Sequence, residues 1–385
     1  MSRFFDLVSK PARDLGTHKA PNIFPAPPEH RSALIKLDSN ENPFGPSPRA
    51  LEAMRTAVGS SNLYPDDDCS PLRRELASYH GLPTEQVLVT AGSTALLSLL
   101  CQTLLAPGLN AVTSQCSFIV YSMAVQAAGA LLIEAPMRED SFDLEAILAA
   151  IDSDTRIVFL ANPNNPTGTV LEASVVESFL SRLPGHVVLI LDEAYYEFAQ
   201  HFAALRKTKY SNSLDYVRQG ASVVVLRTFS KAHGLAGLRI GYGLGPAELL
   251  AYCARMRNTF SVSSVAQAGA LAALHDNLHI GRVVENNAIQ SQVLDAGLSA
   301  LGYRVVPTSA NSLFCDVGEA GAVVAKRLRE EGVAVRPLEH WGAPNCIRVT
   351  IGTPEQNQAL LSAARQLGMR RAATEPRVSS SARGM

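Results

Sequence analysis

Short runs of aliphatic and β-branched residues alternate with longer amphipathic stretches through the middle of the chain, and this alternation restricts the fold most. The runs are continuously apolar, which is typical of strands buried on both faces of a parallel sheet. We expect strands at 87–90, 111–113, 131–133, 157–160, 187–191 and 222–226, separated by helices such as 93–105, 144–150 and 172–181. Alternation of this kind predicts an α/β fold with a large, doubly wound, mostly parallel sheet.

The pattern changes after about residue 277. A long helix expected at 283–300 leads to strands near 303–306, 312–317, 333–335 and 347–350, with a helix at 320–331. This order predicts a smaller α+β domain. We therefore expect four parts: a proline-rich N-terminal arm (1–45) packing with the small domain, a large domain that contains the parallel sheet (46–276), the small C-terminal domain (277–370) and a Ser-rich, disordered tail (371–385).

Composition excludes several classes of protein. The chain has 34 Lys and Arg against 35 Asp and Glu, a balance that argues against nucleic acid as the main partner. Its apolar runs are shorter than a membrane helix needs, and its N-terminus lacks the features of a signal peptide. The six cysteines are far apart in sequence, which indicates reduced thiols in a cytoplasmic protein. The nine histidines form no metal-binding motif, so we expect no metal site.

Ligands of open α/β sheets collect where the strands end, so the polar residues at those positions are the candidates for chemistry. The first strand leads into Gly92-Ser93-Thr94 and then a helix. Free backbone N–H groups and two hydroxyls at a helix N-terminus can hold an anion, although Ser and Thr are also ordinary helix caps.

The strand at 157–160 ends in the rigid segment 161–168, with three Asn, two Asn-Pro pairs and a Gly. The strand at 187–191 leads directly into Asp192 and Glu193, followed by Tyr195. A carboxylate at the end of a buried strand needs a partner, which can be a ligand or a capped backbone group.

The strand at 222–226 leads into a segment in which Lys231 lies between hydroxyl groups and apolar residues, eight residues before Arg239. These groups together suit pyridoxal 5′-phosphate: Lys231 can form a Schiff base with its aldehyde, and Asp192 can keep its ring nitrogen protonated. The phosphate suits the guanidinium and hydroxyl groups, and the ring hydroxyl suits an amide and a phenol. The residues in question are Ser93, Thr94, Asn165, Tyr195, Ser230 and Arg239.

The motifs NPNNPTG, DEAYYEF and TFSKAHGLAGLRIGY resemble those of fold-type I, aspartate-aminotransferase-like enzymes. With LDSNENPFGPSP, LYPDD and IRVTIGT, residues 36–368 are similar to the histidinol-phosphate aminotransferase subgroup. The resemblance implies a homodimer with shared active sites that moves an amino group between a small amino substrate and a 2-oxo acid such as 2-oxoglutarate. It also implies further contacts: Gly92, Phe118, Thr228 and a neighbouring subunit's Tyr64 on the cofactor, and Arg348, Arg336 and Asn40 on the substrate.

Three positions depart from the subgroup pattern. No tyrosine precedes Tyr64, whereas the subgroup has an arm tyrosine near the substrate phosphate. Ala95 follows Ser93-Thr94 where Ser-Asp-Glu is usual, and His233 replaces a phenylalanine. An aminotransferase for aromatic or specialised amino acids therefore remains an alternative, as does a phosphothreonine-type decarboxylase. A cofactor-binding protein without activity would more naturally lack Lys231, and a nucleotide-binding oxidoreductase would need the G-x-G-x-x-G spacing that is missing here.

Overall fold

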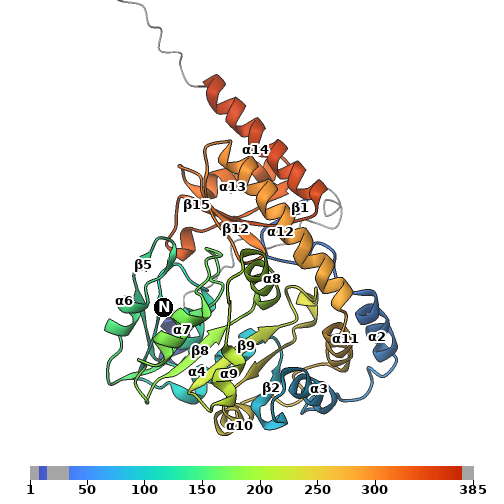
Figure 1. The fold of residues 1–385 in the computed structure, drawn as a ribbon, viewed down its shortest axis with the longest axis vertical. Coiled ribbons are helices and arrows are strands. Elements are labelled where there is room, and N and C mark those ends of the chain that lie inside the picture. The colour runs from blue at the N-terminus through green and yellow to red at the C-terminus, as the bar shows by residue number, and fades with distance from the viewer. Residues whose placement is uncertain (1–7, 15–33, 375–385) are drawn as a thin grey trace, which may run out of the picture.

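The computed structural model describes residues 8–14 and 34–374, which form two sheet-containing domains, one above the other in Figure 1. The strands of the large sheet are β2 (Val87–Thr90), β3 (Asn110–Ser114), β4 (Leu131–Ala135), β7 (Thr155–Ala161), β8 (Val188–Asp192), β9 (Val223–Thr228) and β10 (Gly241–Leu244). Their order is β2-β10-β9-β8-β7-β3-β4. Neighbours are parallel except at β10, which is antiparallel to both β2 and β9. All six expected strands are present.

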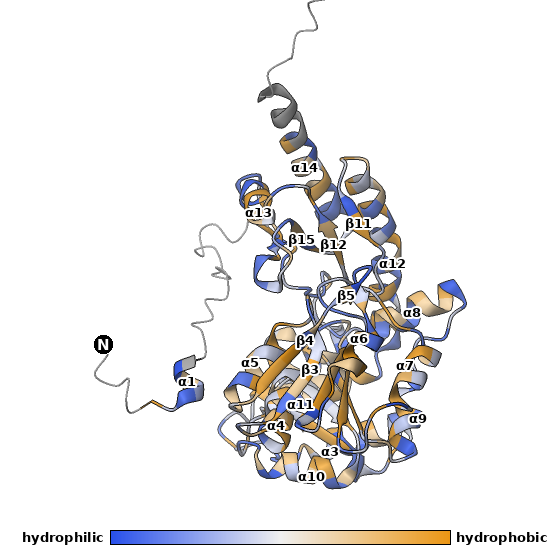
Figure 2. Ribbon diagram, turned by 90° about the vertical axis from the view of Figure 1, so that its left-hand side faces the viewer, coloured by the Kyte–Doolittle hydropathy of each residue, from blue (hydrophilic) through white to orange (hydrophobic). Residues whose placement is uncertain are grey.

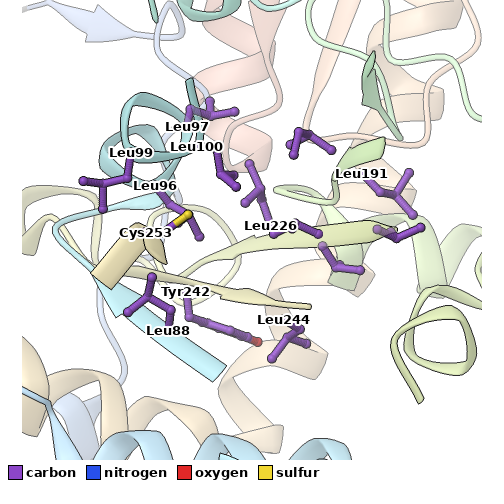
Figure 3. Close-up of a cluster of buried hydrophobic side chains, with 14 of the residues drawn as sticks. Leu88, Leu96, Leu97, Leu99, Leu100, Leu191, Leu226, Tyr242, Leu244 and Cys253 are labelled. Atoms are coloured by element: carbon purple, nitrogen blue, oxygen red, sulfur yellow. The ribbon is translucent and has the colours of Figure 1, made fainter. Parts of the chain in front are cut away.

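The helices of this domain are α2 (Pro48–Val58), α3 (Ser70–His80), α4 (Ser93–Leu104), α5 (Val120–Ala127), α6 (Leu144–Ala149), α7 (Ala173–Leu180), α8 (Tyr196–Arg206), α9 (Ser213–Arg218), α10 (Ala247–Arg255) and α11 (Ser264–Leu274). Most of them cover the two faces of the sheet, whereas α2 packs on α11 and α8 packs on α12 (Asn277–Ser299). Leucines of α4 pack against β2, β9 and β10 (Figure 3). In Figure 2 the strands are strongly hydrophobic, while hydrophilic residues lie on the outer faces of the helices. A short ribbon, β5 (Met137–Arg138) and β6 (Ser141–Phe142), extends from this domain toward the other.

The small domain has an antiparallel sheet of β11 (Arg304–Val306), β12 (Ser312–Asp316), β15 (Cys346–Thr350) and β14 (Arg336–Pro337), in that order. It packs against α13 (Gly321–Glu330), α14 (Pro354–Thr374) and the long helix α12 (Asn277–Ser299). Helix α12 contributes Val283 and Val284 to a cluster with Phe198 of the large domain, and Leu294 and Leu298 to the small-domain core. One helix therefore connects the two cores.

The described part of the N-terminal segment contacts both domains. Helix α1 (Lys10–Asp14) lies against α5 of the large domain. Strand β1 (Ile35–Lys36) pairs in parallel with β13 (Val333–Ala334), and Leu37 is 1% exposed in the small-domain core. The rest of the expected arm, 1–7 and 15–33, lies outside the described residues. So does 375–385 of the expected disordered tail, whereas its first four residues continue helix α14.

Strand β10 was not expected from the sequence. Its residues GYGL include two glycines, which have low strand propensity. In the sequence they are an imperfect match to the G-x-G-x-x-G motif and give no indication of a strand. Glycine is needed in this strand because it passes close to the start of α4: a Cβ on Gly241 would lie 2.5 Å from the backbone N of Ser93. No helix within the described residues has the length and apolar character needed to cross a bilayer.

Candidate active site

A cavity of about 190 Å³ lies at the carboxyl ends of strands β7, β8 and β9, beside the N-terminus of α4. Ten of the expected cofactor contacts line it: Ser93, Thr94, Phe118, Asn165, Asp192, Tyr195, Thr228, Ser230, Lys231 and Arg239. The sheet topology brings together residues that are up to about 150 positions apart, because parallel strands end at the same edge.

One end of the cavity suits a phosphate. Gly92 has φ 87°, and a Cβ there would lie 2.6 Å from Nη2 of Arg239, so only glycine allows the guanidinium to cross the start of α4. Nη1 of Arg239 donates to Oγ of Ser230 at 3.4 Å, and the backbone N of Ser230 donates to Oγ1 of Thr228 at 3.1 Å. The guanidinium, the hydroxyls and the helix N-terminus form a donor set that fits a dianionic phosphate.

The three asparagines after β7 have different roles. Asn162 exchanges two hydrogen bonds with the backbone of Leu171, and Asn164 donates to the carbonyl of Cys116 at 3.1 Å. These bonds fix the loop and tie it to the segment that carries Phe118. Asn165 instead lies at the cavity, where its Oδ1 accepts from Nη1 of Arg348 at 2.7 Å.

The two carboxylates after β8 also differ. Glu193 is held by Arg227, with Oε2 at 2.8 Å from Nε and 2.5 Å from Nη2, and it accepts from two serine hydroxyls. Asp192 lines the cavity, and its Oδ2 accepts from the hydroxyl of Tyr121 at 3.0 Å. Burial raises the pKa of Asp192 to about 6, while the hydrogen bond from Tyr121 opposes that rise. Glu193 is therefore structural, and Asp192 remains free to face a ligand.

Lys231 extends from the loop after β9 into the cavity. Its Nζ donates to the carbonyls of Ser39 and Asn40, at 3.3 and 3.2 Å. Burial and the positive charge of Arg348 lower the pKa of Lys231 to about 7. A substantial fraction of this amine is therefore neutral near pH 7, the form that can act as a nucleophile or accept a proton.

Arg336 and Arg348 lie directly opposite each other in the β14–β15 pair. Both are nearly buried, and both donate to the carbonyl oxygen of Asp38, at 3.1 and 2.8 Å. Their other acceptors are uncharged, namely Oγ of Ser39 and Oδ1 of Asn165. Within the described residues, Nε of Arg348 is buried without a hydrogen-bond partner. Among the carboxylates of the described residues, only that of Asp38 lies near enough to raise the pKa of both arginines. Two positive charges therefore face one negative charge, and the arginine pair carries an excess positive charge.

Three other expected or unusual residues are not among those that line the cavity. Asn40 is 1% exposed, and its amide donates to protein groups, the hydroxyl of Tyr195 (2.9 Å) and Oγ of Ser312 (3.1 Å). Tyr64 is 82% exposed and stacks on Phe260 with ring centroids 4.6 Å apart. His233 is buried with its ring edge on Phe229, and burial lowers its pKa to about 4.

Sequence reasoning missed Tyr121 and the carbonyls of residues 38–40. Tyr121 reads as a core aromatic, since it stacks on Phe159 at 4.6 Å. A tyrosine three residues after Phe118, on the first turn of a helix, was the available signal. Backbone carbonyls carry no sequence signal. Within the described residues, no group of three His, Cys, Asp or Glu side chains is placed to hold a metal ion.

Comparison with known proteins agrees with this geometry. Residues 32–363 match the model of the family described as aminotransferase class I and II. Histidinol-phosphate aminotransferase 2 of Pseudomonas fluorescens is 43% identical over 336 residues, covering 87% of this chain and 89% of that enzyme.

Two solved structures have the same fold. Histidinol-phosphate aminotransferase from Sinorhizobium meliloti, in complex with pyridoxal-5′-phosphate, aligns with a TM-score of 0.84 and 28% identity over 95% of this chain and 99% of that one. Thermus thermophilus aspartate aminotransferase with maleate aligns with a TM-score of 0.77 and 26% identity, over 88% and 91% of the two chains.

These similarities confirm the predicted fold class, the large parallel-sheet domain with a smaller α+β domain. They also confirm the resemblance to the fold-type I aminotransferases and to their histidinol-phosphate subgroup. The chain belongs to the aminotransferase class I and II family.

Proposed function

We propose that this protein is a pyridoxal 5′-phosphate-dependent aminotransferase that acts on histidinol phosphate or a close analogue, with a 2-oxo acid such as 2-oxoglutarate as the amino acceptor. Three features of the cavity support this cofactor: the hydrogen-bond donors around Arg239, which fit a phosphate, the buried carboxylate of Asp192, and Lys231. The similarity to enzymes named for histidinol phosphate supports the substrate.

The bound cofactor would supply an electron sink that stabilises negative charge on the substrate's α-carbon. Asp192 would hold a proton on the ring nitrogen, because its carboxylate is ionised above a pKa of about 6. Asn165 and Tyr195 would donate to the ring oxygen. Lys231, with its lowered pKa, would accept the proton of the substrate's α-carbon on Nζ and return it later in the reaction.

The buried arginine pair is the observation that carries the substrate proposal. Burying two guanidinium groups with mostly neutral acceptors is unfavourable unless an anion completes the site. Arg348 would bind an acidic group of the amino substrate in one half of the reaction and of the 2-oxo acid in the other. Arg336 would add a second contact when the substrate is a phosphate dianion.

Specificity constants for histidinol phosphate and phenylalanine, measured on one preparation, test the substrate. We expect a clear preference for histidinol phosphate. We also expect Arg336→Ala to raise the KM for histidinol phosphate strongly, with a much smaller effect on any phenylalanine reaction. A preference for phenylalanine would replace the proposed substrate with an aromatic amino acid and leave the aminotransferase assignment intact.

Lys231 is proposed as the point of covalent cofactor attachment. Borohydride reduction of the loaded enzyme followed by peptide mass spectrometry should find the cofactor on Lys231, and an adduct on another lysine would contradict the assignment. Lys231→Ala should retain cofactor through the phosphate and ring contacts, and should lose turnover by several orders of magnitude.

We also propose a homodimer in which Tyr64 of each chain contacts the phosphate of the other chain's cofactor. Exposed apolar side chains close in sequence to the stacked pair Tyr64 and Phe260 support this: Val58 is 57% exposed, Leu63 64% and Met256 50%. Sedimentation should find a dimer at micromolar concentration, and an active monomer would refute it. The six free cysteines support a cytoplasmic location.

A further inference from the structure

Asn40 occupies a strained and completely enclosed position between the two domains. Its φ is 53°, in the left-handed region that asparagine tolerates better than most residues. Its Nδ2 donates to the hydroxyl of Tyr195 in the large domain and to Oγ of Ser312 in the small domain. Its Oδ1 accepts from Oγ1 of Thr350 at 3.2 Å. The side-chain amide is therefore fully engaged with the protein and is not free to bind substrate.

Thr350 fixes which way this amide points. Its Oγ1 accepts the backbone N–H of Asn40 at 2.9 Å, so its own proton is available to donate to Oδ1. Rotating the amide by 180° would place its NH₂ group on Thr350 and an acceptor oxygen on Tyr195, and the Thr350 proton would lose its acceptor on the amide. The observed network thus directs an N–H donor at the tyrosine.

A donor at this position determines what Tyr195 can do. The phenolic oxygen has a single proton, and because it accepts from Asn40, that proton is left to be donated elsewhere. Tyr195 lines the cavity, so the group that receives its proton is a ligand in the cavity. The contact with Asn40 and the charge of Arg348 both oppose the rise that burial causes in the pKa of Tyr195, and so make the hydroxyl a better donor.

We propose that Asn40 is a positioning residue that orients the Tyr195 hydroxyl as a hydrogen-bond donor toward the ring oxygen of pyridoxal phosphate. This inference rests on the cofactor assignment above. Because Ser312 and Thr350 both belong to the small-domain sheet, with Thr350 two residues after Arg348, the orientation of Tyr195 depends on how that domain is placed. Asn40 therefore links the substrate-binding strand to the electronic state of the cofactor.

Asn40→Gly tests the proposal. Glycine accepts φ 53° without strain and removes the amide without adding charge. The readout is the pH midpoint of the visible absorbance change of the cofactor-loaded enzyme, which reports stabilisation of the ring oxygen's negative charge. Loss of one donated hydrogen bond should raise this midpoint by about 0.4 to 1 pH unit. In a Tyr195→Phe background, the same substitution should leave the midpoint unchanged.

Ser312→Ala is the matched control, because it removes the other acceptor of the same amide and leaves the bond to Tyr195. Its midpoint should stay within about 0.2 pH units of the wild-type value, well below the effect of losing a hydrogen bond. Asn40→Asp keeps the backbone conformation and the acceptor for Thr350 but lacks the N–H donor, and it replaces Asn40→Gly if that variant does not fold. The negative charge it adds acts on the cofactor with or without the phenol, so the Tyr195→Phe background separates the two effects.

An unchanged midpoint in Asn40→Gly, or equal shifts with and without the Tyr195 hydroxyl, would overturn the proposal. Failure of the wild-type protein to take up pyridoxal phosphate would instead overturn the proposed function itself, so the two failures are distinguishable.

Discussion

Tyr121→Phe should change the charge of Asp192 while leaving the packing around it intact. The ring that stacks on Phe159 is retained, and only the hydroxyl that donates to Oδ2 of Asp192 is lost. A buried hydrogen bond to a carboxylate contributes about 1.5–3 kcal/mol, which corresponds to a rise of roughly 1–2 pH units in the pKa of Asp192. From about 6 in the native enzyme, the pKa would reach about 7–8.

The sign of the effect follows from the carboxylate. Asp192 is ionised above its pKa and loses its charge as pH falls through it, so the variant loses the charged partner of the ring nitrogen at a higher pH. At pH 7 the ionised fraction would fall from about nine-tenths to between about one half and one tenth. This predicts an affinity for pyridoxal phosphate that is roughly two- to tenfold weaker at pH 7, with little change at pH 9.

Titration of cofactor into the cofactor-free protein at both pH values measures this difference. Asp192→Asn is the control, and adding Tyr121→Phe to it should change nothing further. A loss of affinity that is equal at pH 7 and pH 9, or that persists in the Asp192→Asn background, would mean that Tyr121 acts through packing and not through the carboxylate.

Three further predictions concern the surroundings of the cavity. Glu193→Gln leaves a buried guanidinium unpaired and should cost about 3–5 kcal/mol in urea unfolding, with part of the loss recovered by adding Arg227→Met; a cost below about 1 kcal/mol would contradict this reading of the pair. Gly234→Ala should destabilise the protein by several kcal/mol in thermal unfolding, because φ is 72° and the new Cβ would lie 2.2 Å from a backbone carbonyl oxygen. Gly237→Ala is the control, since a Cβ there would have nothing within 4 Å, and it should be nearly neutral. In cofactor-free protein, labelling of Lys231 by an amine-reactive reagent should rise through a midpoint near pH 7, since the reactive neutral form appears above its lowered pKa; a midpoint near pH 10 in peptide-resolved mass spectrometry would refute the lowering.

The strands that carry the chemistry could be predicted because each is a continuous apolar run that ends in polar residues. Asp192 and Lys231 could be placed at one common site from the sequence alone, since parallel strands present their carboxyl ends at one edge. Strand β10 could not be predicted, because its two glycines have low strand propensity and are selected by close packing against the start of α4.

The substrate side of the site depended more on long-range pairing. Arg336 and Arg348 were both named, but their direct opposition arises from the register of β14 and β15, which a separation of twelve residues does not reveal. Asn40 was expected to touch substrate, and the structure places its amide on Tyr195, 155 residues away in sequence. The roles of buried amides depend on which neighbours the tertiary fold brings to them, and single-sequence patterns do not contain that information.

The antiparallel direction of β10 has a consequence for local stability. Since β9 and β10 both meet the sheet edge where the cavity lies, the loop at 229–240 leaves and re-enters the sheet at one place, closed by the bond from the backbone N of Phe229 to the carbonyl of Ile240. Lys231 and Arg239 are therefore anchored by the same pair of strands. Amide hydrogens of this loop can exchange with solvent in two ways: the loop's own short-range hydrogen bonds open, or strands β9 and β10 separate. The amides that need the second route should exchange as slowly as those in the core of the sheet.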